Sequence, residues 1–146
     1  MKLLFICTGN TCRSPMAEAL AKVILGPEFD IGSAGMSAWE GAPASDHAIK
    51  VMEDRGIDLA SHCARQVTEE LLREADWVIP MTEGHEIRLC AQYPEYVKKI
   101  RRLGNWGLSG QDILDPYGGS LQIYQSSADE IEKMIYDIKN ELDNLA

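Results

Sequence analysis

The chain has 146 residues, of which 45% are hydrophobic, and this is the size and composition of one ordinary domain with a single buried core. Its formal net charge of −9 disfavours nucleic acid and anionic membranes as partners, so a bound phosphate group would need local positive potential. We therefore expect one domain over residues 1–146, with neither nucleic acid nor a membrane as partner.

The start of the chain and its cysteines indicate in which cellular compartment we expect the protein. Met1–Ile6 is apolar, but Thr8 soon interrupts the run, which is far too short for a signal-peptide core or a membrane span. We expect a cytoplasmic protein whose four cysteines stay mostly reduced, with Cys63 and Cys90 as small buried hydrophobic residues. The cysteines and histidines lack the paired spacing of structural zinc sites, so we expect no bound metal.

The first predicted elements are a strand, a loop and a helix. Leu3–Cys7 is a short apolar run, typical of a strand that is buried on both faces of a parallel sheet. A loop that contains glycine follows. It leads into a helix over Met16–Leu25, with Ser14 as the expected N-cap and Pro15 in the first turn.

Strands and helices continue to alternate along the chain. Further strands are predicted over Phe29–Ser33, Trp77–Ile79 and Ile100–Leu103. Further helices are predicted over Ser45–Arg55, Thr68–Ala75, Thr82–Tyr93 and Ser120–Leu145. This alternation predicts an α/β three-layer sandwich with a four-stranded, mostly parallel central sheet and helices on both faces. Ligands of such sheets bind beyond the carboxyl ends of the strands, where Cys7 falls.

The loop after the first predicted strand carries the chemistry, and it reads Cys7-Thr8-Gly9-Asn10-Thr11-Cys12-Arg13-Ser14. The backbone N–H groups of such a loop, together with a helix N-terminus, hold an oxyanion. The lysine-containing pattern of nucleotide-binding loops is absent, and Arg13 offers a planar fork for two phosphate oxygens. Cys7 is then expected to act as a thiolate that attacks phosphorus and forms a phosphocysteine intermediate. The alternative is a buried strand cysteine beside a solvated arginine, which the other residues of the loop disfavour.

Four segments, in order along the chain, resemble the low-molecular-weight protein tyrosine phosphatase family. They are Cys7–Ala19, which begins with the family's C-x5-R-[ST] signature at Cys7–Ser14, then Ser33–Gly35, Ser61–Gln66 and Asp115–Gly118. The resemblance implies that Cys7 is the nucleophile, that Arg13 clamps the phosphate, and that Ser14 donates a hydrogen bond to the thiolate. It implies no metal or organic cofactor, because side chains supply every catalytic group.

The resemblance also assigns supporting roles. Asn10 would hold the strained shape of the loop, with Ser33 and His62 behind it in a hydrogen-bond network. Asp115 would be the general acid and base, and Asp112 is its nearest rival in the sequence. As a turn residue followed by proline, Asp115 would otherwise have a structural role.

Two further residues gain roles from the family. The cysteine that matches Cys12 forms a reversible disulfide with the nucleophile in this family, which implies a redox role for Cys12; the alternative is a passive small side chain. Trp39 matches an aromatic residue of the pocket wall, and the alternative is a partly exposed loop tryptophan.

Thr11 and Tyr117 bear on the substrate, which we expect to be a phosphorylated protein. The family's tyrosine phosphatases usually carry a branched apolar residue where this chain has Thr11, and a hydroxyl there suits a guanidinium leaving group better than a phenyl ring. The loop and the segment Asp115–Ser120 look most like the bacterial protein-arginine phosphatase branch, although Tyr117 stands where that branch has a familiar phenylalanine.

We therefore expect phosphoarginine as the substrate, with phosphotyrosine as the alternative. An arsenate reductase would need a second pair of closely spaced cysteines, and a phosphoprotein-binding module would have no use for the thiolate. The sequence leaves the oligomeric state open.

Overall fold

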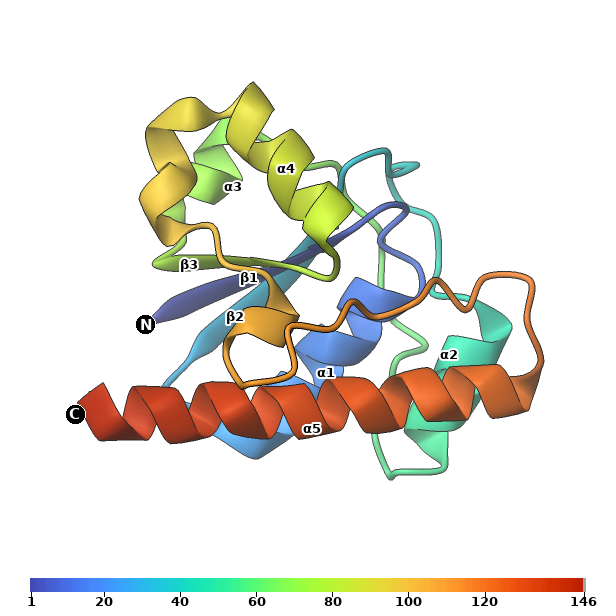
Figure 1. Ribbon diagram of the computed structural model, residues 1–146. Helices are drawn as coiled ribbons and strands as arrows, with labels where there is room; N and C mark the ends of the chain where they lie inside the picture. The colour runs from blue at the N-terminus through green and yellow to red at the C-terminus, as the bar shows by residue number, and fades with distance from the viewer. Residues whose placement is uncertain (146) are drawn as a thin grey trace.

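A computed structural model describes residues 1–145 (Figure 1). The strands are β1 (Lys2–Cys7), β2 (Asp30–Gly35) and β3 (Trp77–Pro80). The helices are α1 (Arg13–Leu25), α2 (Asp46–Glu53), α3 (Glu69–Glu74), α4 (Glu83–Gln92) and α5 (Leu121–Leu145), with short 3-10 turns η1 (Pro94–Lys99) and η2 (Leu103–Asn105). The order and type of the predicted helices are confirmed, and their ends differ by at most three residues.

The sheet is parallel and has the strand order β2-β1-β3. β1 is the central strand, and its last residue, Cys7, pairs with Gly35 at the end of β2. The side chains of β1 alternate between two hydrophobic clusters, as the pleat requires. Leu3, Phe5 and Cys7 belong to one cluster, whereas Leu4 and Ile6 belong to the other.

The two clusters separate the helices into two layers. α1, α2 and α5 contribute to the cluster on one face of the sheet, and α3 and α4 contribute to the cluster on the other. Figure 1 shows the same division, with α5 passing across α1 and α2 below the strands and the pair α3 and α4 above the strands. The predicted α/β arrangement with helices on both faces is therefore confirmed.

The prediction of a fourth strand over Ile100–Leu103 is wrong. In residues 1–145 the sheet has three strands, and Ile100 contributes a single parallel bridge to Val78. The Arg101 N–H donates to the Val78 carbonyl oxygen at 2.9 Å, but the next donor from β3 would be residue 80, which is a proline without an N–H, so the pairing ends there. Leu103 then starts η2.

Two smaller expectations are also corrected. Ser14 does not cap α1, which begins one residue earlier, because its hydroxyl is engaged by Cys7 and Asn10. Cys63 is exposed rather than buried, since it lies in a surface loop where the neighbouring Ala64 fills the core, and Cys90 is only partly buried. By contrast, Thr68, where the predicted helix begins, caps α3 and accepts the Leu71 N–H at 3.2 Å.

The stretch from residue 1 to 145 holds no helix long and apolar enough to cross a bilayer. The long helix α5 instead places an apolar stripe against the core. The buried members of this stripe include Ile131, Met134, Ile135, Ile138 and Leu142.

We predict that Ile138→Ala lowers the free energy of unfolding by about 2–4 kcal/mol, because the side chain is fully buried and its removal leaves a cavity. Gln125→Ala on the exposed side of the same helix should change it by less than about 0.5 kcal/mol. Urea unfolding of the two variants measures both values. Equal losses of unfolding free energy in the two variants would show that the buried face of α5 does not stabilise the core.

Candidate active site

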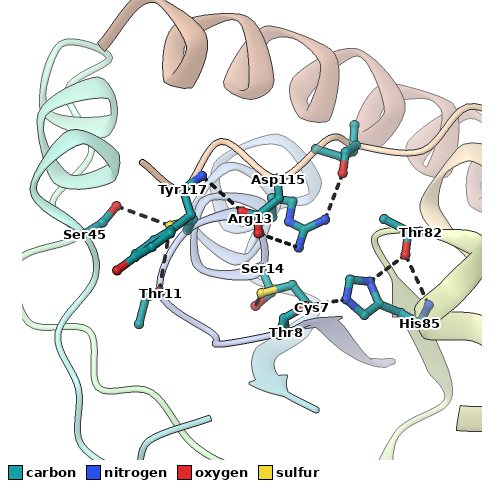
Figure 2. A network of polar contacts seen from close by, with 12 residues as sticks. Cys7, Thr8, Thr11, Arg13, Ser14, Ser45, Thr82, His85, Asp115 and Tyr117 are labelled. Atoms are coloured by element: carbon teal, nitrogen blue, oxygen red, sulfur yellow. Dashed lines mark hydrogen bonds and ion pairs between the residues drawn. The ribbon is translucent and has the colours of Figure 1, made fainter. Parts of the chain in front are cut away.

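The loop between β1 and α1 lies at the carboxyl end of the central strand. It forms one side of a cavity of about 230 Å³. Two residues of the loop before α5, Asp115 and Tyr117, complete the lining. The loop contributes Cys7, Thr8, Gly9, Thr11, Cys12 and Arg13. Figure 2 shows Arg13 above Cys7, with Asp115 next to the guanidinium group and Tyr117 to the left.

Cys7 lies at the base of the site. Its side chain is buried, and its Sγ lies 2.9 Å from Ser14 Oγ. Ser14 belongs to the first turn of α1, so the same helix N-terminus that carries the positive end of the macrodipole also carries this hydroxyl. The sulfur is therefore held where an anion is stabilised.

Arg13 is buried and belongs to the lining of the cavity. Its Nη1 donates to the carbonyl oxygen of Ile113 at 3.0 Å, which fixes the plane of the guanidinium group. Its Nη2 lies 3.7 Å from Asp115 Oδ2. A fixed planar guanidinium at a helix N-terminus is suited to two oxygens of a phosphoryl group.

Asp115 and Asp112 have different surroundings. Asp115 has a half-exposed side chain that faces Arg13 across the cavity, and its Oδ1 accepts the N–H of Tyr117 at 3.1 Å. Asp112 instead accepts the backbone N–H of Glu83 at 2.9 Å, lies 4.0 Å from Arg102, and lines a separate cavity. Of the two, Asp115 is the carboxylate that can reach a group bound above Cys7.

Asn10 holds the loop in a conformation that few side chains adopt. It has a φ of +57°, in the left-handed region, and its side chain is fully buried. Its Nδ2 donates to Ser14 Oγ at 2.8 Å and to Ser33 Oγ at 2.9 Å. Its Oδ1 accepts the N–H of Arg65 at 3.0 Å, and its carbonyl oxygen accepts a hydrogen bond from His62 Nε2 at 2.8 Å.

The structure thus brings Asn10, Ser33 and His62 together. It also adds two residues to this network that the sequence did not indicate. Glu18 accepts a hydrogen bond from Ser33 Oγ at 2.6 Å, and Arg65 donates to the Ser33 carbonyl oxygen at 2.9 Å. Both residues lie in segments that resemble the family, and this resemblance was the signal that could have found them.

His85 is a second residue that sequence reasoning missed. It lies in the first turn of α4, just after the carboxyl end of β3, and its side chain is buried. Its Nε2 lies 2.9 Å from Thr8 Oγ1, and its Nδ1 lies 2.9 Å from Thr82 Oγ1 (Figure 2). Its position after a strand of a parallel sheet was the signal that could have found it.

His85 is held in its neutral form. Burial first, then Arg13 and Arg88, lower the pKa of His85 from 6.5 to about 4. The carboxylates of Asp112 and Asp115 oppose this shift only in part. The imidazole therefore carries no charge at neutral pH.

Cys12 faces away from the solvent. Its Sγ lies 3.3 Å from Tyr124 Oη and 3.5 Å from Ser45 Oγ. Tyr124 is buried, and burial together with the Cys12 contact raises its pKa to about 12. All four cysteines are free, so the disulfide between Cys7 and Cys12 stays a prediction.

The two residues expected to set specificity with Thr11 differ in their placement. Tyr117 stands at the rim of the cavity with 77% of its surface exposed. Trp39 is 83% exposed and does not belong to the cavity lining within residues 1–145. Its role in the pocket wall stays a prediction.

A buried cysteine at a helix N-terminus, a fixed arginine and a carboxylate facing them define the site of a cysteine-dependent phosphatase. The model of one protein family, low molecular weight phosphotyrosine protein phosphatase, matches residues 2–145. The chain belongs to this family, and it is a protein phosphatase.

Similar proteins fall into two groups of named activity. A protein-arginine-phosphatase of Bacillus subtilis (strain 168) is 40% identical over 147 residues, which cover 97% of each chain. The low molecular weight protein-tyrosine-phosphatase Wzb of Salmonella typhi is 38% identical over 125 residues, which cover 86% of this chain and 83% of Wzb.

Among solved structures, the YwlE arginine phosphatase with a phosphorylated active-site serine in place of cysteine superposes with a TM-score of 0.93. It is 38% identical, and the match covers 98% of this chain and 96% of that chain.

We predict that Asn10→Ala lowers the free energy of unfolding by about 2–4 kcal/mol. The change removes three buried side-chain hydrogen bonds and leaves alanine in the left-handed region. Asn10→Gly loses the same bonds but tolerates the positive φ, so it should be the more stable of the two by about 1 kcal/mol. Urea unfolding of both variants tests this, and equal stabilities would exclude backbone strain at this position.

A further prediction concerns pH. Unfolded protein binds a proton at His85 near pH 6.5, whereas the folded protein binds it only near pH 4. Lowering the pH from 6.5 to 4 should therefore destabilise the fold, with His85 contributing up to about 3 kcal/mol. Urea unfolding across this pH range should show a smaller loss for His85→Gln than for the parent protein. An equal loss of unfolding free energy in the two proteins between pH 6.5 and 4 would contradict a neutral buried imidazole.

Proposed function

We propose that this phosphatase hydrolyses phosphoarginine residues in proteins through a phosphocysteine intermediate at Cys7. The observation that carries the proposal is the hydroxyl of Thr11 on the wall of the cavity above Cys7. Thr11 Oγ1 lies 3.8 Å from Cys12 Sγ, a weak contact that leaves it available to a ligand. A guanidinium group offers N–H donors to this hydroxyl, whereas a phenyl ring would bury it without a partner. The 40% identity to a protein-arginine-phosphatase supports the same substrate.

In the proposed first step, Cys7 Sγ attacks phosphorus, so that an S–P bond forms and the P–N bond to the arginine side chain breaks. Ser14 Oγ, 2.9 Å away, donates to the sulfur and keeps it an anion before attack. Arg13 and the loop amides bind the equatorial oxygens, where charge gathers in the transition state. Asp115 gives its proton to the leaving nitrogen, which departs as part of a stable guanidinium group.

The second step regenerates the enzyme. Asp115, now a carboxylate, takes a proton from a water molecule that attacks phosphorus from the side opposite the sulfur. The O–P bond forms, the S–P bond breaks, and Cys7 leaves as a thiolate while inorganic phosphate is released. The half-exposed position of Asp115 gives water access to it, which this step requires.

Phosphotyrosine is the second candidate, and Tyr117 favours it. Its ring stands exposed at the rim of the cavity, where it can pack against the phenyl ring of a substrate. The 38% identity to a protein-tyrosine-phosphatase supports this alternative.

The proposed reaction uses no metal or organic cofactor, because Cys7, Arg13 and Asp115 supply the nucleophile, the clamp and the acid. The cytoplasm, expected from the sequence, is the proposed location.

The test compares kcat/KM of the purified protein on phosphoarginine and phosphotyrosine peptides of the same sequence. We predict a preference for phosphoarginine, and Thr11→Ile should lower the ratio of the two values by at least about tenfold, since it replaces a hydrogen bond with an apolar wall. Cys7→Ser is the blank, and it should lose turnover while still binding inorganic phosphate.

Two results would contradict these proposals. A clear preference for phosphotyrosine that Thr11→Ile leaves unchanged would exclude the arginine assignment while the mechanism stands. Full turnover by Cys7→Ser would exclude the phosphocysteine mechanism itself.

A further inference from the structure

A chain of polar contacts runs from the start of α4 to the wall of the cavity. Thr82 Oγ1 accepts the backbone N–H of His85 at 3.1 Å and lies 2.9 Å from Nδ1 of the same residue. On the other side of the ring, Nε2 lies 2.9 Å from Thr8 Oγ1. Figure 2 shows the imidazole between the two hydroxyls, with Thr8 next to Cys7. Both ring nitrogens therefore have partners, and one of these partners lines the cavity.

The contact with His85 determines in which direction the remaining hydrogen-bonding positions of Thr8 Oγ1 point. A hydroxyl has two lone pairs and one proton, and the imidazole occupies one of these three. Whichever ring nitrogen carries the proton, at least one lone pair of Thr8 Oγ1 remains to accept a hydrogen bond from a ligand. The hydrogen bond to a buried ring also restricts rotation of the Thr8 side chain, so this acceptor keeps a fixed direction.

The charge state of the ring suits a cationic ligand. The low pKa of His85, about 4, leaves it uncharged at neutral pH, so it does not repel a guanidinium group in the cavity. A protonated imidazole at the same place would add to the positive charge of Arg13 and oppose such a ligand. A buried imidazole needs partners for both of its nitrogens, and here one of the two partners is a residue that lines the cavity.

We propose that His85 is a positioning residue for substrate choice, which fixes Thr8 Oγ1 as a second acceptor, beside Thr11 Oγ1, for N–H groups of a phosphorylated guanidinium. This inference rests on the proposed activity toward phosphoarginine. The two threonines come from one loop and both line the cavity, so they can contact different nitrogens of the same planar group. A phenyl ring has no donor for either hydroxyl, so the arrangement selects against phosphotyrosine.

The experiment measures the ratio of kcat/KM on phosphoarginine to kcat/KM on phosphotyrosine peptides. His85→Leu removes the contact, and Thr8→Val removes the hydroxyl while keeping the shape of the side chain. Each change should lower the ratio by about ten- to hundredfold, as expected for one hydrogen bond to a charged group. The double variant should be no worse than the more affected single variant, because both changes remove the same interaction.

Two variants provide controls. His85→Gln keeps a side chain that can hydrogen-bond to Thr8, and it should recover at least half of the ratio that His85→Leu loses. Ile87→Ala changes an exposed residue of the same helix and should leave the ratio unchanged. Thermal unfolding of every variant reports its stability independently of the ratio.

The outcomes separate this inference from the proposed activity. Suppose the parent protein hydrolyses phosphoarginine, but His85→Leu and Thr8→Val lower kcat/KM equally for both substrates. His85 is then only structural, and the inference is overturned while the proposed activity stands. The inference is also overturned if the effects of the two single changes on the ratio add up in the double variant. If the parent protein does not hydrolyse phosphoarginine, the proposed activity fails, and this inference fails with it.

Discussion

The conformation of Asn10 is the constraint on which the rest of the site depends. The loop must turn sharply between the end of β1 and the start of α1 so that its amides face one point, and a positive φ at residue 10 makes that turn. A non-glycine residue in this region costs about 1–2 kcal/mol, which the surroundings must offset. Asn10 donates hydrogen bonds to Ser14 and Ser33 and accepts others from Arg65 and His62, and these four bonds provide the compensation.

The same network links the three segments that the site needs. Ser14 contacts Cys7 and Asn10, Ser33 belongs to the neighbouring strand β2, and His62 comes from the loop between α2 and α3. The reactive sulfur is therefore placed by a framework that reaches across the sheet. A buried polar network of this kind is costly if one member is missing, because each remaining group loses its partner in a place that water cannot reach.

The sequence predicted those parts of the structure that depend on local patterns. The apolar run before Cys7, the helix start at Thr68 and the stripe along α5 each signal their element within a few residues. The predicted fourth strand failed because the pattern of Ile100–Leu103 says nothing about its partner, and β3 ends in Pro80, which has no N–H to continue the pairing after Val78.

The loop of the candidate site could be read in the same way, since Cys7 through Ser14 are consecutive. Its partners could not be found from spacing alone. Thr8 and His85 are 77 positions apart, and Asn10 and Arg65 are 55 apart. Only the parallel register of β1 with β2 and β3 brings the ends of these strands, and the residues that follow them, to one edge. The resemblance to a family supplied Ser33 and His62, whereas His85 lay outside its quoted segments.

The floor and the walls of the cavity come from different parts of the molecule. Cys7, Arg13 and the Asn10 network form a floor that is buried and mutually bonded, whereas Tyr117 projects from a separate loop and is mostly exposed. Mutations in the walls can therefore accumulate at little cost to folding, while mutations in the floor are selected against. In such a design, a lineage of related phosphatases can diverge in the side chain it recognises and still inherit the same chemistry unchanged.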